Sequence, residues 1–172
     1  MPEKPLVLTG FMGSGKSSVG RFLAERLACC FIDLDAEIVT TAGRSINEIF
    51  ADQGEQFFRS LERECLERVL SGGIAVIATG GGAVISDQNR AIMRGRGIVI
   101  NLVVSLPTVL ARLHGATDRP LFTGDDSVNS VKSLMDARED FYADADIRID
   151  TDDKSVEDVS AEILRFVKGL PA

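Results

Sequence analysis

Residues 10–17 read GFMGSGKS, and this stretch decides the fold. It has the spacing G-x-x-x-x-G-K-S/T, in which glycines let the backbone turn tightly and direct its N–H groups towards a phosphate. An apolar run at residues 6–9 precedes the loop, and a helical pattern at residues 17–28 follows it. The positive end of that helix would point at the same place. Because the loop stands between a strand and a helix, it is predicted to bind the phosphates of a nucleotide.

Within the loop, two side chains are suited to nucleotide chemistry. Lys16 is expected to reach the β- and γ-phosphates, and the hydroxyl of Ser17 is expected to bind Mg²⁺. The alternative is a glycine-rich turn that holds no ligand. No Asn-Lys pair occurs in the sequence, so it lacks the N-K-x-D guanine-binding motif of GTPases. The predicted nucleotide-binding residues of the loop are Gly13, Ser14, Gly15, Lys16, Ser17 and Ser18.

Outward from the loop, apolar runs alternate with helical patterns along the chain. The runs are continuous rather than alternating, which favours a parallel sheet covered on both faces. The βα alternation predicts an open α/β sheet, whose ligands bind at the carboxyl ends of the strands. The runs occupy residues 6–9, 30–32, 74–79, 98–104 and 147–149, and the main helical patterns occupy residues 17–28, 55–70, 87–94, 106–113, 128–142 and 155–167.

Length, composition and charge narrow the class of protein. A chain of 172 residues with 45% apolar and 26% charged residues is typical of one globular domain, here residues 1–172. No run of 18 apolar residues occurs, so we expect no membrane span. The net charge of −7 argues against a nucleic-acid partner, whose phosphates require basic patches.

The cysteines and the first residues bear on the compartment. An odd number of cysteines, Cys29, Cys30 and Cys65, is a poor disulfide framework and fits a reducing compartment. All three are expected to be small buried apolar side chains. The N-terminal apolar run is too short for a signal sequence, so we expect a cytoplasmic protein. No exposed apolar stripe suggests a dimer, so we expect a monomer.

Two carboxylates follow the second apolar run. Asp33 and Asp35 lie two residues apart, and in an extended segment such side chains point the same way. We expect the strand that carries them to neighbour the phosphate loop. One carboxylate could order water around Mg²⁺, and the other could accept the proton of an attacking hydroxyl. The alternative is a polar turn that opens a helix at Ala36, because Asp is also a good N-cap.

Two further clusters could bind an acceptor substrate. Arg59 and Glu62 lie three residues apart on one predicted helix, where Glu62 could orient the guanidinium towards a substrate anion. The alternative is a surface ion pair of little energetic value. The glycines at 80–82 follow a strand and would let a ligand approach the backbone closely. A bare flexible turn is the alternative there.

With these motifs in place, the chain resembles the shikimate kinases, in the nucleoside-monophosphate-kinase-like group of P-loop proteins. The resemblance covers about residues 5–152. Its motifs are GFMGSGKS at 10–17, DLD at 33–35, F-x-x-x-G-E-x-x-F-R-x-x-E at 50–62, GGG at 80–82 and RPL at 119–121. It implies the P-loop NTPase three-layer sandwich, an α/β fold with a mainly parallel five-stranded sheet and helices on both faces.

The resemblance also implies the reaction and its participants. Such kinases transfer the γ-phosphoryl group of ATP to the 3-hydroxyl of shikimate, giving 3-phosphoshikimate and ADP, a step towards chorismate and the aromatic amino acids. ATP is the co-substrate, with one Mg²⁺ per subunit. Residues 36–62 would form acceptor-binding helices, and residues 112–127 would form a lid. The alternatives are a gluconate-type sugar-acid kinase and a non-catalytic nucleotide-binding module.

Carried over residue by residue, the resemblance assigns roles to the clusters above. The lid would bring Arg119 to the phosphates and exclude water, although a solvated arginine in a loop is the alternative. Arg112 stands where the family often has an adenine-stacking arginine. His114, the only histidine, is interpreted as a loop residue rather than a base. The catalytic residues would be Lys16, Asp35 and Arg119, the metal-binding residues Ser17 and Asp33, and the shikimate-binding residues Asp35, Arg59, Gly81, Gly82 and Arg138.

Overall fold

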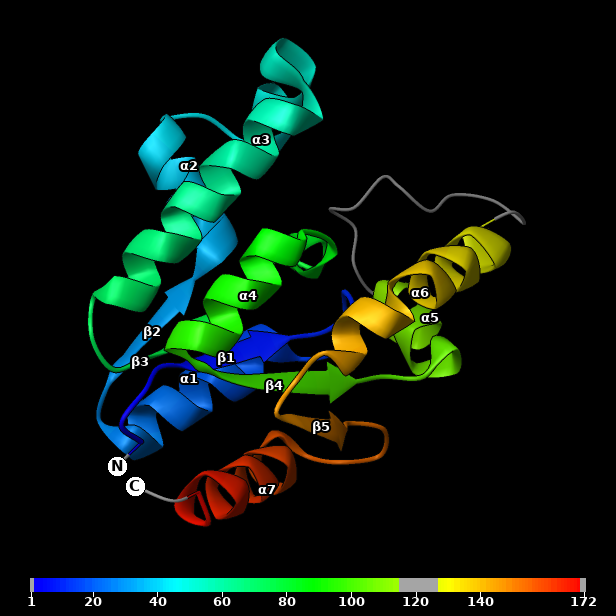
Figure 1. The fold of residues 1–172 in the computed structure, drawn as a ribbon. Coiled ribbons are helices and arrows are strands. Elements are labelled where there is room, and N and C mark those ends of the chain that lie inside the picture. The colour runs from blue at the N-terminus through cyan, green and yellow to red at the C-terminus, as the bar shows by residue number, and fades with distance from the viewer. Residues whose placement is uncertain (1, 115–126, 171–172) are drawn as a thin grey trace.

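A computed structural model describes residues 2–114 and 127–170 of the chain. Five parallel strands form one sheet in the order β2-β3-β1-β4-β5 (Figure 1). All four residues of β1 and of β3 are buried, because these central strands are covered on both faces. The strands are β1 (Leu6–Thr9), β2 (Cys30–Asp33), β3 (Ala75–Ala78), β4 (Ile98–Val103) and β5 (Ile147–Asp150).

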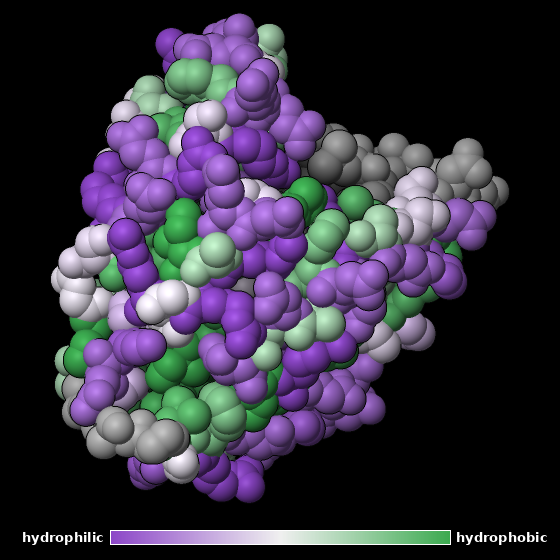
Figure 2. All heavy atoms as spheres, viewed as in Figure 1, coloured by the Kyte–Doolittle hydropathy of each residue, from purple (hydrophilic) through white to green (hydrophobic). Residues whose placement is uncertain are grey.

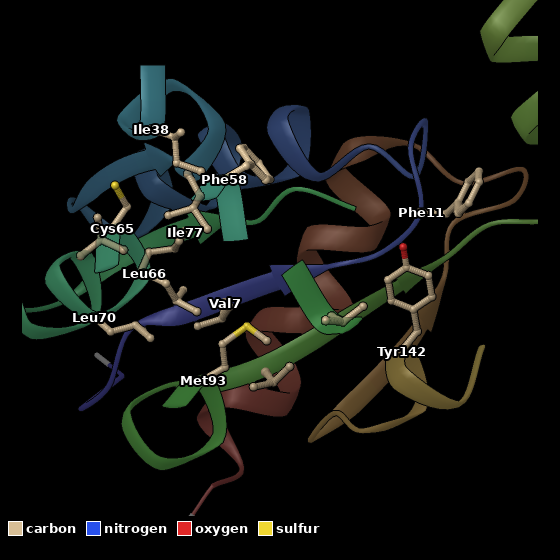
Figure 3. Close-up of a cluster of buried hydrophobic side chains, with 14 of the residues drawn as sticks. Val7, Phe11, Ile38, Phe58, Cys65, Leu66, Leu70, Ile77, Met93 and Tyr142 are labelled. Atoms are coloured by element: carbon tan, nitrogen blue, oxygen red, sulfur yellow. The ribbon is translucent and has the colours of Figure 1, made fainter. Parts of the chain in front are cut away.

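Helices cover both faces of this sheet and complete the predicted three layers. One apolar cluster packs residues of α1 and α7 against one face, and the second packs residues of α3, α4, α5 and α6 against the other. Figure 3 shows the second cluster, in which Leu66 and Met93 lie beside Val7 and Ile77 of the central strands. The helices are α1 (Lys16–Leu27), α2 (Leu34–Ala42), α3 (Ile46–Ser71), α4 (Asp87–Arg96), α5 (Leu106–His114), α6 (Ser127–Ala143) and α7 (Val156–Lys168), and a 3₁₀ turn, η1, spans Ala83–Ile85.

Local signals in the sequence explain where α2 and α3 begin and bend. The Asp33 side chain accepts hydrogen bonds from the backbone N–H groups of Asp35 and Ala36, so it caps α2. Ser45 and Glu48 form a capping box at the start of α3. Gly54 has the non-helical angles φ 80° and ψ 174°, and it kinks α3 at this point. The kink separates the short first part of α3 from the long helix that carries Arg59.

Of two expectations about β2, one is confirmed and one is wrong. β2 pairs with β3 and is separated from β1 by that strand, yet its end lies beside the phosphate loop as expected, with Oδ2 of Asp33 3.5 Å from the Ser17 hydroxyl. Asp33 and Asp35 do not share an extended segment, since Asp33 ends β2 and Asp35 lies in the first turn of α2. The helix begins as early as Leu34 because Asp33 acts as its cap.

The cysteines differ in burial. Cys65 is buried in the core, Cys29 is half-buried, and Cys30 is exposed, so the expectation of three buried thiols is wrong. Cys30 begins the edge strand β2, where one side of the sheet has no neighbouring strand. All three cysteines are free. None of them therefore takes part in a disulfide.

The surface agrees with the acidic, polar composition. Figure 2 shows mostly hydrophilic side chains on one face of the molecule, with smaller apolar areas between them. Among the residues the structure describes, no helix combines the length and apolar character needed to cross a membrane.

Candidate active site

The phosphate loop is shaped by glycine backbone geometry. Gly15 caps α1 with a left-handed backbone, φ 90°. A Cβ on Gly10 would lie 2.5 Å from the carbonyl oxygen of Leu102, so this position accepts no side chain. The amine of Lys16 donates hydrogen bonds to the carbonyl oxygens of Gly10 (2.7 Å) and Phe11 (3.0 Å). These contacts hold the predicted phosphate-binding amine over the loop.

Oxygen atoms from α1 and β2 meet beside the loop. The Ser17 hydroxyl lies 3.5 Å from Oδ2 of Asp33, and Oδ1 of Asp33 caps α2. The two residues offer hard oxygen donors, which suit Mg²⁺, and this ion usually keeps several waters in addition to one or two protein ligands. Within residues 2–114 and 127–170, no group of three or more His, Cys, Asp or Glu side chains forms a metal cluster. The donor set fits a magnesium ion shared with phosphate and water.

An open cleft lies at the carboxyl ends of β1, β2 and β3. One wall is the phosphate loop and the start of α1, and the other is formed by β2, α2 and the turn after β3. Eight of the predicted site residues line it: Gly13, Gly15, Lys16, Ser17, Ser18, Asp33, Asp35 and Gly81. The predicted nucleotide side and acceptor side therefore face one another across one space.

Each glycine of the 80–82 turn lies against a different predicted acceptor residue. A Cβ on Gly80 would lie 2.7 Å from Oδ1 of Asp35, and a Cβ on Gly82 would lie 2.7 Å from Nη2 of Arg59. At Gly81 the nearest atom would be Nη1 of Arg138, at 3.5 Å. The absence of side chains on the turn lets Asp35 of α2 and Arg59 of α3 approach the backbone, beside Arg138 of α6. The turn is therefore closely packed against these side chains, and its role in binding an acceptor stays a prediction.

Arg59 is held by a buried acid. Its Nη1 lies 3.0 Å and 3.2 Å from the two carboxylate oxygens of Glu62, which is only 1% exposed. The amide of Asn89, itself buried, donates to the same carboxylate at 3.4 Å. The pair is therefore a buried, hydrogen-bonded one and not the surface ion pair of the alternative. Ser45 and Glu48, by contrast, form an exposed cap.

Burial is the main influence on Glu62. It raises the pKa of this carboxyl above its ordinary value, and the nearby charge of Asp35 adds to the rise. The Arg59 guanidinium and the Asn89 hydrogen bond act in the opposite direction. The net direction is upward, because removing a carboxylate from water disfavours its charged form. A buried acid with a raised pKa beside an arginine predicted to bind the acceptor is typical of a functional site.

Tyr142 belongs to the site although its sequence position did not suggest it. The side chain is 5% exposed, and its hydroxyl donates a 2.6 Å hydrogen bond to the carbonyl oxygen of Gly81. Burial raises the pKa of the Tyr142 phenol, while the neighbouring Arg138 lowers it by a smaller amount. The available signal was the spacing from Arg138, since residues four apart share one face of a helix.

The structure describes some of the remaining predicted site residues and leaves others outside the described ranges. Arg112 of α5 donates a hydrogen bond to the carbonyl oxygen of Gly13, so it lies at the edge of the phosphate loop. Ser14 is buried within that loop. Arg119 and most of the predicted lid at 112–127 lie outside the described residues, as does the side chain of His114. The closing arginine therefore stays a prediction.

Comparison with known proteins shows similarity to shikimate kinases. The family model described as shikimate kinase matches residues 12–168. The shikimate kinase of Geobacter sulfurreducens is 54% identical over 165 residues, which are 95% of this chain and 90% of that protein.

Solved structures give the same result. A shikimate kinase from Acinetobacter baumannii, in complex with shikimate, has a TM-score of 0.89 and 34% identity, covering 98% of this chain and 96% of that one. A gluconokinase from Sinorhizobium meliloti has a TM-score of 0.65 at 20% identity, over 96% of this chain and 92% of that one. The second likeness shows a shared fold alone.

Proposed function

The chain belongs to the shikimate kinase family, and we propose that the cleft between the phosphate loop and the glycine turn performs that family's reaction. The reaction transfers the γ-phosphoryl group of ATP to the 3-hydroxyl of shikimate. One observation carries the assignment of the cleft. Each glycine at 80–82 adjoins a different one of three residues, Asp35, Arg138 and Arg59, and Gly80, Gly81 and Asp35 line the same cleft as the phosphate loop.

On the acceptor side, charge and hydrogen-bonding capacity match shikimate, which is a carboxylate with several hydroxyls. Arg59 and Arg138 come from different helices and would grip the carboxylate from two directions, because guanidinium groups bind carboxylates with strong, directed hydrogen bonds. The backbone of Gly81 and Gly82 would donate to the same ligand. Glu62 would keep the Arg59 guanidinium in place, since its carboxylate contacts Nη1. Nη2 lies beside the turn and 3.4 Å from Oε1 of the exposed Glu55.

Asp35 would act on the attacking hydroxyl. It lines the cleft opposite the phosphate loop, and a carboxylate within hydrogen-bond reach of a hydroxyl can accept its proton during transfer. The hydroxyl oxygen then attacks the γ-phosphorus, the bond to the β,γ-bridging oxygen breaks, and ADP leaves. Positioning of the two substrates supplies much of the catalysis in such a step.

On the nucleotide side, backbone and cations would share the phosphate charge. The loop N–H groups of residues 13–18 and the amine of Lys16 would bind the β- and γ-phosphates. Ser17 and Asp33 would hold one Mg²⁺ per subunit, which neutralises phosphate charge when bound. Arg112 would contact the adenine, and Arg119 would reach the transferred phosphoryl group from the lid.

We also propose that the protein acts as a cytoplasmic monomer. The three free cysteines fit a reducing compartment. The proposed mechanism uses the residues of one chain and assigns no role to a second subunit. Gel filtration with light scattering should give a mass near the 18.5 kDa of one chain.

The experiment that tests this function is an ADP-release assay with shikimate, with gluconate and with no acceptor. We expect rapid release with shikimate and only background release in the other two reactions. Release with gluconate alone would support the sugar-acid kinase, and the absence of any acceptor-dependent release would support a nucleotide-binding module. The Ile163→Val variant, altered in the core between α7 and α1 and outside the lining of the cleft, serves as a folded control with unchanged rates.

A further inference from the structure

The three carbonyl groups of the glycine turn are held in two different ways. The Gly80 carbonyl accepts from the Ala83 N–H and the Gly82 carbonyl from the Ile85 N–H, each at 3.1 Å. Both bonds are local and belong to the 3₁₀ turn η1. The middle carbonyl, that of Gly81, instead accepts from the Tyr142 hydroxyl at 2.6 Å, across 61 positions of the chain. The centre of the turn therefore depends on α6.

This bond controls the direction of a backbone donor. A peptide unit is planar, so fixing the Gly81 carbonyl also fixes the N–H of Gly82. Glycine has the widest backbone freedom of any residue, and consecutive glycines leave such a peptide free to rotate unless it is held. The Tyr142 hydroxyl removes that freedom in the peptide that joins Gly81 to Gly82.

The same tyrosine adjoins Arg138. A Cβ on Gly81 would lie 3.5 Å from Nη1 of Arg138 and 3.6 Å from the Tyr142 oxygen, so the two groups flank one point of the turn. Nε of Arg138 is buried and has no hydrogen-bond partner within the described ranges. A phenol oxygen accepts as well as donates a hydrogen bond, and can serve both groups at once.

We propose that Tyr142 is a positioning residue for the acceptor, whose hydroxyl holds the Gly81 carbonyl while it lies against the guanidinium of Arg138. This inference rests on the proposed function, because it assumes that Arg138 and the glycine turn bind shikimate. Tyr142 does not touch the reacting atoms. It sets the spacing between a charged side chain and a backbone donor that bind one ligand.

The packing of α6 does not depend on this hydroxyl. Arg90 of α4 donates to the Val84 carbonyl of η1 at 2.6 Å, and its guanidinium lies 4.8 Å from the ring centre of Phe141. This contact ties η1 to α6 independently of Tyr142. We therefore expect Tyr142→Phe, which keeps the buried ring, to fold and to retain its helix packing.

Kinetics separate positioning from a merely structural role. In Tyr142→Phe we expect the KM for shikimate to rise about tenfold, the effect of one buried hydrogen bond. The KM for ATP and kcat should stay within about twofold, because the lost interaction stabilises bound shikimate equally in the ground state and in the transition state. Ile163→Val is the matched control, since it lowers stability slightly without touching the cleft. An unchanged shikimate KM in a folded Tyr142→Phe would overturn the proposal.

A second measurement needs no variant. Tyr142 is the only tyrosine and the chain has no tryptophan, so the tyrosine emission of the wild type reports this side chain alone. We expect that emission to change with added shikimate and to saturate. Tyrosine emission that does not change with added shikimate, in an enzyme that turns over shikimate, would contradict the proposal. If the wild type does not turn over shikimate at all, the proposed function fails first, and this inference fails with it.

Discussion

The two walls of the cleft are built in opposite ways. The phosphate loop is eight consecutive residues whose backbone N–H groups are proposed to bind the phosphates, and glycine conformation shapes it. The acceptor wall gathers side chains from α2, α3 and α6 around the turn at residues 80–82. The phosphate wall is thus formed by a single stretch of sequence, whereas the acceptor wall forms only when distant segments come together on folding.

The difference has a physical consequence for substitutions. On the phosphate wall, a Cβ at Gly10 would meet the backbone oxygen of Leu102 at 2.5 Å, which cannot move easily. On the acceptor wall, a Cβ at Gly82 would meet the end of the flexible Arg59 side chain. We therefore expect changes on the phosphate wall to damage folding or turnover outright. Changes on the acceptor wall should mainly alter the affinity for shikimate.

The largest expected effect is that of Lys16→Met. It removes the cation that would contact the β- and γ-phosphates, and the loss of a close charged donor at such a site costs about 3 kcal/mol or more. We expect turnover to fall at least about 100-fold, while shikimate binding, measured by calorimetry, stays near that of the wild type. If shikimate binding were lost as well, the two walls would not be separable.

Asp35→Asn should come next and act on the opposite wall. The amide keeps the shape of the side chain but cannot accept the proton of the attacking hydroxyl, and general-base catalysis contributes about 10²–10⁴-fold. We expect kcat to fall by at least about 100-fold with ATP binding preserved. Steady-state kinetics with a nucleotide-binding titration measure both quantities. A normal kcat would remove Asp35 as the base.

Gly82→Ala should have a moderate effect that is confined to the acceptor wall. Its Cβ would lie 2.7 Å and 3.0 Å from the two terminal nitrogens of Arg59, which must shift. We expect the KM for shikimate to rise several-fold, with little change in the ATP KM or in the melting temperature. Gly95→Ala in α4 is the control, because its Cβ would meet nothing within 4 Å and alanine favours a helix. Equal kinetics in the two variants would contradict the placement of Arg59.

The smallest expected effect is a change in the pH dependence of stability in Glu62→Gln. The folded-state pKa of Glu62 is raised, so the folded protein binds more protons than the unfolded chain between the ordinary glutamate pKa, about 4.3, and the raised value. The wild type should therefore lose stability, relative to Glu62→Gln, as pH rises through that window. Melting temperatures of both proteins across the window measure the difference, and parallel curves would contradict the raised pKa.

The phosphate wall can be predicted from the sequence almost completely because its information is contiguous. The positions of Lys16 and Ser17 follow from the loop spacing and from the strand and helix on either side. The residues of the acceptor wall can also be identified, but their geometry cannot. The two-residue spacing predicts that Asp33 and Asp35 share one extended segment, whereas the cap at Asp33 starts a helix between them. Asp33 therefore caps α2 through Oδ1, while its Oδ2 stays beside the Ser17 hydroxyl.

Other features depend on long-range packing that no local pattern encodes. The pairing of each glycine at 80–82 with a separate side chain requires α2, α3 and α6 to converge. The separation of β2 from β1 depends on strand order, which chain order does not reveal. Tyr142 resembles an ordinary core residue near the end of a helix, and only the contact with Gly81 gives it a place in the site.

A crystal structure of the protein with shikimate bound would show directly whether the two walls serve one reaction. We predict that the shikimate carboxylate lies within hydrogen-bond distance of both Arg59 and Arg138, beside the glycine turn. A hydroxyl of the same ligand should lie against Asp35 on the side that faces Lys16. Shikimate bound elsewhere, with Arg59, Arg138 and Asp35 making no contact to it, would refute the proposed acceptor wall.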